Sequence, residues 1–143
     1  MEPHTIQIIE RFVKPGDSCI DAGAHVGDMS DALLKAAGDS GRLYLFEILG
    51  KNIQALQQRF KNNTNVVVIP KAVSNQTGTC QMFLSPVGST FESGLLDHDM
   101  RDRPMVKGSM IPCIRIDDFM KDLLPRMNFI IAVPSEKSQG LLA

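Results

Sequence analysis

Hydrophobic residues in the first half of the chain follow two spacings, one typical of helices and one typical of buried strands. Steps of three and four residues, as at Met29, Leu33 and Ala36, predict amphipathic helices. Continuous apolar runs such as residues 66–69 predict strands of a parallel sheet. The predicted elements are a helix at 6–13 with Thr5 as N-cap, a strand ending at 19–20, a helix at 29–37 capped by Gly38, a strand at 42–46, a helix at 51–60 and a strand at 66–69.

The second half has a different pattern. Residues 79–84 alternate between wetter and more apolar positions, which predicts an antiparallel strand. Residues 85–107 show no usable period, as is typical of a functional or disordered loop. A strand at 110–116 is expected at a sheet edge because Pro112 lacks an N–H group. A short helix capped by Asp117 or Asp118 and an apolar strand at 127–133 complete the prediction.

The order strand, helix, strand, helix, strand predicts a right-handed, doubly wound α/β unit. With 143 residues the chain has the length of about one domain. The fold class expected is therefore α/β, a Rossmann-like and mostly parallel sheet. In such sheets, ligands bind at the carboxyl ends of the strands.

Composition narrows the classes of function. Apolar residues make up 43% of the chain and charged residues 22%, which favours a packed core over disorder. The net charge of −1 gives no reason to expect a nucleic-acid partner. Neither a secretory signal nor a membrane span is predicted. The three cysteines show no metal-ligand or disulfide spacing, so we expect reduced, mostly buried thiols in a cytoplasmic protein and no metal site.

The glycine motif Asp21-x-Gly23-x-x-x-Gly27 lies where the first strand should meet the second helix. A dinucleotide fingerprint would need glycine where His25 and Asp28 stand, and a P-loop would need a lysine after Gly27. Glu47 closes the next predicted strand, where a carboxylate can accept hydrogen bonds from both hydroxyls of a ribose. Bare backbone N–H groups at the start of the helix are expected to face the ligand.

This motif resembles the first motif of class I S-adenosylmethionine (SAM)-dependent methyltransferases, and the order of landmarks is similar to the FkbM-type family. The matching segments are 14–17, 21–27, 46–47, 71–74 with Gly78, 93–96, 115–119 and 128–130. The resemblance implies the class I methyltransferase type of fold, SAM as cofactor, and O-methylation of a hydroxyl on a small molecule, a sugar or a lipid. It implies cofactor contacts at Asp21, Gly23, Ala24, His25, Gly27, Glu47, Ile48, Ala72 and Val73.

The chain departs from the FkbM pattern after Ile130. The family continues into an acidic strand end, whereas here Val133 and Pro134 follow. We therefore expect a methyltransferase domain at 1–130, a divergent tail at 131–143, a fold incomplete at its C-terminus and an open sheet edge that favours self-association. No residue is assigned as catalytic.

Three functions remain open at this stage. The first is an FkbM-type methyltransferase. The second is a catalytically impaired isoform that acts as a SAM-binding or protein-interaction module. The third is a nicotinamide-dependent oxidoreductase, which His25 and Asp28 disfavour.

Overall fold

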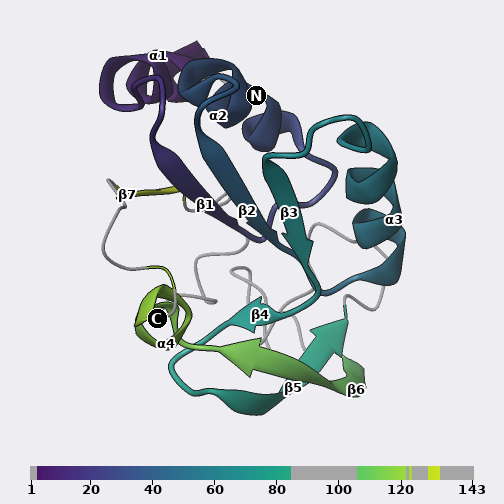
Figure 1. Cartoon of the computed structure of the whole chain (residues 1–143). Helices are drawn as coiled ribbons and strands as arrows, with labels where there is room; N and C mark the ends of the chain where they lie inside the picture. Colours follow the sequence, from purple (N-terminus) through teal and green to yellow (C-terminus); the bar gives the residue numbers. More distant parts are fainter. Residues whose placement is uncertain (1–2, 85–105, 122, 124–128, 133–143) are drawn as a thin grey trace.

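A four-stranded parallel sheet forms the centre of the structure, a computed structural model that describes residues 3–84, 106–121, 123 and 129–132. Every neighbouring pair in this sheet is parallel (Figure 1). The central strand β1 pairs with β2 on one side and with β7 on the other. The order across the sheet is β3 (Val66–Ile69), β2 (Arg42–Phe46), β1 (Ser18–Ala22) and β7 (Phe129–Ala132).

Helices cover both faces of this sheet (Figure 1). Alternate residues of β1 point to opposite faces, so Cys19 and Ile20 belong to different apolar clusters. On the second face, the ring of Phe119 packs edge-on against the ring of Phe46, with 5.0 Å between centroids. The first face carries α1 (Pro3–Phe12), α2 (Asp28–Ala37) and α3 (Gly50–Arg59), and the second carries α4 (Ile116–Lys121). The α/β, Rossmann-like, doubly wound fold expected from the sequence is confirmed.

A second, three-stranded sheet lies beyond the carboxyl end of β2 (Figure 1). Its strands are β4 (Ala72–Val73), β6 (Val106–Ile114) and β5 (Gly78–Leu84), in that order. β5 and β6 are antiparallel, whereas β4 and β6 are parallel. Ile48 and Leu49, which follow β2, pack against the apolar side chains of this sheet, so it is joined to the edge where a ligand is expected.

Pro112 lies in the middle strand of the second sheet, so the prediction of an edge strand is wrong. The register explains how the proline is tolerated. β5 pairs with β6 at Pro112, but β4 pairs only with Cys113 and Ile114. The missing N–H group of Pro112 therefore faces no partner strand on the β4 side.

Smaller differences concern α1 and β3. Thr5 lies inside α1 rather than at its N-cap, because the helix begins at Pro3, whose fixed φ suits a first turn. Phe12, which shares the helical apolar spacing of Ile9 and Val13, is 61% exposed, while Ile9 and Val13 are buried. Val67 is 42% exposed, whereas its neighbours Val66 and Val68 point to the opposite face and pack against the core.

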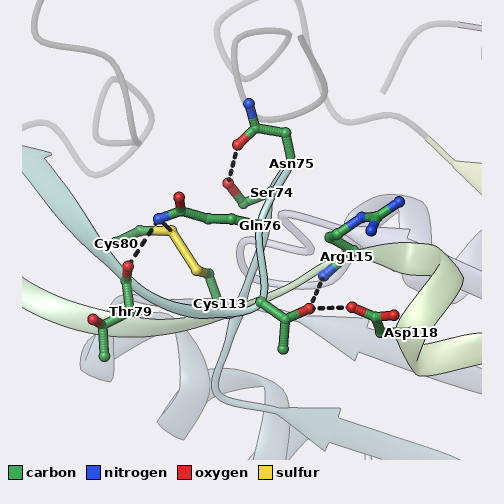
Figure 2. Close-up of a disulfide and its surroundings, with 9 residues drawn as sticks. Ser74, Asn75, Gln76, Thr79, Cys80, Cys113, Arg115 and Asp118 are labelled. Carbon is green, nitrogen blue, oxygen red and sulfur yellow. Dashed lines mark hydrogen bonds between the residues drawn. A yellow bond between two sulfur atoms is a disulfide. The ribbon is translucent and has the colours of Figure 1, made fainter.

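Cys80 and Cys113 are joined by a disulfide between β5 and β6, which corrects the expectation of three reduced thiols. Figure 2 shows this bond with Gln76 beside it, whose side-chain amide nitrogen lies 3.4 Å from the Cys80 sulfur. The pairs Cys80–Ile111 and Gly78–Cys113 place the two cysteines diagonally across the ladder, with Cα atoms 6.0 Å apart. The two cysteines are 33 positions apart in the sequence, which gives no sign of this proximity. Cys19 is a buried free cysteine, and burial raises its pKa to about 11.

Some expectations fall outside the described residues. These are residues 85–105 of the loop expected at 85–107, residues 133–143 of the tail expected at 131–143, and the FkbM-like segment at 93–96. Residues 106–107 lie in β6 and residues 131–132 in β7. Within the described ranges, no helix combines the length and the apolar character that crossing a bilayer requires.

Candidate functional site

The glycine loop, residues 23–27, joins β1 to α2 and is tied to the end of β2. The N–H groups of Gly23 and Ala24 donate to the Phe46 carbonyl at 2.8 and 2.9 Å. Gly23 and Gly27 have φ values of 79° and 99°, the left-handed region that glycine adopts readily. His25 has a φ of 58°, which is uncommon for a residue with a side chain. The sequence correctly placed this turn, but its first N–H groups serve the protein rather than a ligand.

Glu47, directly after β2, is the buried anchor of the loop. It is only 6% exposed. One carboxylate oxygen accepts the His25 N–H at 2.8 Å, and the other accepts the N–H groups of Ile48 and Leu49 at 2.8 and 3.0 Å. The carboxylate therefore holds the loop and the start of α3 against the same strand end.

These contacts limit what Glu47 has left for a ribose. A carboxylate offers about four lone-pair sites, and three backbone donors already use it here. Counting the bonds from the described residues, one site is left for a ligand hydroxyl, on the oxygen that accepts the His25 N–H. Accepting both ribose hydroxyls, as the sequence suggested, would require Glu47 to release one backbone bond.

Asp21 lies under the loop rather than on its surface. Its side chain is 1% exposed, and it points to the face of the sheet that α2 covers. The Ser30 hydroxyl donates to an oxygen of the Asp21 carboxyl at 2.7 Å. Burial raises the pKa of Asp21 to about 6; the Ser30 bond lowers it, and the charge of Glu47 raises it.

A cluster of charges surrounds the first turn of α2. Arg59 of α3 forms ion pairs with Asp28 and Asp31 and donates to the Val26 carbonyl at 2.8 Å. The first turn of any helix has N–H groups without intrahelical partners. Because the N–H groups of Gly23, Ala24 and His25 are used elsewhere, backbone donors for a ligand are left to this turn.

The other expected contacts lie next to the loop or in the second sheet. Ile48 is half-buried against the second sheet. Ala72 and Val73, which form β4, are each 3% exposed and belong to separate apolar clusters. These two residues can therefore contact a cofactor through their backbone groups and apolar side chains, but they provide no charged group. Burial lowers the pKa of His25, against the opposing effect of the charges of Glu47 and Asp28.

Two residues of this site were missed from the sequence. Ser30 left a signal, since it is a polar residue on the apolar stripe that continues through Leu33 and Ala37. No sequence pattern identifies Arg59, because its role depends on how α3 packs beside α2. Its contacts with Asp28 and Asp31 span 28 residues or more.

Comparison with known proteins agrees with the class of site. No family model matches the chain. The Ribosomal RNA large subunit methyltransferase E of Vesicomyosocius okutanii subsp. Calyptogena okutanii (strain HA) is 30% identical over an alignment of 129 residues that covers 87% of this chain and 57% of the relative. The chain is similar to SAM-dependent methyltransferases. It spans a little more than half the length of this curated relative.

Solved structures of such methyltransferases overlap with parts of the chain. A putative rRNA methylase from Clostridium thermocellum is 28% identical and has a TM-score of 0.46, over 48% of this chain and 39% of the other. Fibrillarin from Aeropyrum pernix, solved with SAM bound, is 23% identical and has a TM-score of 0.41, over 43% of this chain and 26% of the other. These overlaps are too partial to add to the argument from topology.

The expectation of no nucleic-acid partner does not stand. The curated relative is named for ribosomal RNA. The expectation rested on a net charge of −1, which averages over the whole chain. Contacts with phosphates depend instead on where individual lysines and arginines lie, so a near-neutral chain does not exclude RNA.

Proposed function

We propose that this chain binds SAM at the glycine loop and serves as the cofactor-binding part of a methyltransferase. The observation that carries the proposal is the pairing of this loop with Glu47, the buried carboxylate at the end of β2. The arrangement sits at the carboxyl edge of a parallel sheet, where such folds bind nucleosides. The sequence similarity to a methyltransferase over 87% of the chain supports it independently.

The charges at the loop fit SAM better than a dinucleotide. Four carboxylates, those of Asp21, Asp28, Asp31 and Glu47, lie around it with one guanidinium, that of Arg59. This excess of negative charge would repel a pyrophosphate and would attract the sulfonium and ammonium groups of SAM. The residues present therefore fit the cofactor that the sequence suggested, and they argue against the nicotinamide alternative.

The division of labour follows from the geometry. SAM, when bound, supplies an activated methyl group. We propose that Glu47 and the loop hold the nucleoside, that the first turn of α2 and the carboxylates hold the amino-acid part, and that Ile48, Ala72 and Val73 lie against the base. The proposed domain comprises residues 1–130.

The acceptor is proposed from the comparisons. Ribosomal RNA is the first substrate to test, because the curated relative is named for it. A hydroxyl of a small molecule, sugar or lipid, and the FkbM assignment behind it, have only the order of sequence motifs as support.

The cofactor is tested by calorimetry with SAM, S-adenosylhomocysteine and NADH. We expect both adenosyl compounds to bind more tightly than NADH. Glu47→Gln places an amide N–H₂ among backbone donors and should weaken SAM binding about tenfold or more, from a loss of about 1.5–3 kcal/mol. Glu10→Gln, an exposed change on α1, is the matched control. Tighter binding of NADH than of SAM would overturn the proposal.

The acceptor is tested with SAM that carries a labelled methyl group. Large-subunit ribosomal RNA and a panel of sugars and lipids are incubated with the chain, and the label is followed. Label in RNA alone would support the proposal. Label in a sugar or lipid would restore the motif-based hypothesis, and binding without transfer to any of them would favour a non-catalytic SAM-binding module.

A further inference from the structure

Ser30 is a buried polar residue in the first turn of α2, and no property of the motif requires it. Its exposed fraction is 0%, and Leu33 and Ala37 on the same helical stripe pack into the core. A buried hydroxyl costs stability unless it is hydrogen-bonded. The partner of Ser30 is the Asp21 carboxyl, at 2.7 Å, so a side-chain hydrogen bond ties α2 to the end of β1, just before the glycine loop.

The bond joins two groups of different character. Asp21 is 1% exposed and lies between the core and the loop. A carboxylate in such a place is disfavoured by burial, and a hydroxyl donor is one of the few groups that favours its charged form without adding a charge. The hydroxyl also fixes which way the carboxylate points.

We propose that Ser30 is a positioning residue of the cofactor site, whose hydroxyl keeps the Asp21 carboxylate charged and oriented beneath the glycine loop. The inference rests on the proposed function, since the charge acts on a cationic cofactor. Loss of the hydroxyl leaves Asp21 to become neutral, and the site loses part of its attraction for the sulfonium and ammonium groups of SAM.

Other titratable groups lie near Asp21, and their effects on the pH profile must be distinguished from the titration of Asp21. The charge of Glu47, directly after β2, raises the pKa of Asp21, and Asp21 in turn raises the pKa of Cys19, two residues before it on β1. His25, in the adjacent loop, interacts with Glu47 and Asp28 instead. Arg59 compensates Asp28 and Asp31 at the helix start rather than Asp21. Ser30 differs from all of them because removing its hydroxyl changes no formal charge, so a shift in the pH profile can be assigned to Asp21.

The test is the affinity for SAM, measured by calorimetry from pH 5 to pH 9. In the wild type, affinity should fall as Asp21 takes up a proton near pH 6. In Ser30→Ala this fall should begin at higher pH, by about 1 pH unit or more, because a hydrogen bond to a charged group is lost. Between the two midpoints the variant should bind several-fold more weakly, and at pH 9 the two should agree.

Convergence at high pH separates this role from simple damage to the fold, which would weaken binding at every pH. Ser30→Thr keeps the hydroxyl and should restore the wild-type profile. Ser18→Ala removes a serine, 7% exposed, at the far end of β1 and should leave the profile unchanged. Asp21→Asn should remove the step near pH 6.

Two results would overturn the inference and differ in what they mean. If the wild type binds SAM and Ser30→Ala gives the same profile, Ser30 only fills space and the proposed function stands. If the wild type does not bind SAM, the proposed function fails, and with it the claim that Asp21 serves a cofactor.

Discussion

The glycine loop owes its shape to three residues in the left-handed region, Gly23, His25 and Gly27. His25 has a side chain there, which costs on the order of 1 kcal/mol relative to an ordinary conformation. The hydrogen bond from its N–H group to Glu47 offsets part of this cost. The residue is therefore strained at the point where the loop is tied to β2, so its conformation depends on Glu47.

Gly27 allows a sharper prediction at the level of one atom. A Cβ at this position would lie 2.9 Å from the Phe60 ring and 3.1 Å from Leu56, in a backbone conformation of φ 99°. We expect Gly27→Ala to lower the free energy of unfolding by about 2–4 kcal/mol, from backbone strain and overpacking together. Urea unfolding measures the change.

Gly50 is the matched control for this prediction. A Cβ there would meet nothing within 4 Å, and Gly50 is the first residue of α3. Gly50→Ala should leave stability unchanged or raise it by up to about 1 kcal/mol. Equal effects of the two substitutions would mean that the loop is not packed against α3 as described.

At the scale of elements, Arg59 links α3 to the start of α2. It contacts two aspartates and one loop carbonyl, yet its side chain is 34% exposed. Partly exposed ion pairs contribute little, so Arg59→Met should cost about 1 kcal/mol or less, and less still in high salt. Its effect on SAM affinity should exceed that of Lys61→Met, an exposed change nearby. Equal affinities would show that the loop keeps its shape without Arg59.

The disulfide makes a second prediction at this scale. Closing a 33-residue loop stabilises the folded state by about 3–4 kcal/mol in the chain-entropy model. Reductant should therefore lower the Tm by about 10 °C. The double variant Cys80→Ala/Cys113→Ala should have this lower Tm without reductant, and reductant should not change it. A wild-type Tm that reductant leaves unchanged would mean that both thiols are free, as the sequence suggested.

The elements that the sequence predicted well are those whose signal is local. Periodic apolar residues located α2 and α3, and β-branched runs located β3. Three features were missed because each depends on segments far apart in the chain. They are the place of β6 in the middle of its sheet, the disulfide between Cys80 and Cys113, and the contacts of Arg59. Local propensity carries no information on which distant segment will pack against a given element.

In the candidate site, the same limit divides success from failure. The sequence placed Glu47 and the loop at one strand end because the carboxyl ends of parallel strands share an edge. It could not reveal that backbone N–H groups already occupy Glu47, since that depends on the exact path of residues 23–27.

Asp21 affects the stability of the whole molecule through pH. Its pKa rises from 3.8 to about 6 on folding, so between these values the folded chain holds a proton that the unfolded chain has lost. The contribution of Asp21 to stability is therefore full below about pH 4 and is lost as pH rises through 6, a difference of about 3 kcal/mol. Asp21→Asn should gain stability relative to the wild type over this window. Urea unfolding at pH 4 to 7 tests it; parallel curves for the two proteins would contradict the assignment.

The central strand β1 takes one neighbour, β2, from nearby sequence and the other, β7, from far downstream, where Phe129 pairs with Ser18. On a ribosome that adds about 5–20 residues per second, β1 is made roughly 5–20 s before β7. During that interval one side of β1 presents unpaired N–H and C=O groups. We therefore expect β1, which is fully buried in the finished fold, to form an exposed sheet edge in the nascent chain. Chaperones that recognise extended segments could bind to this edge.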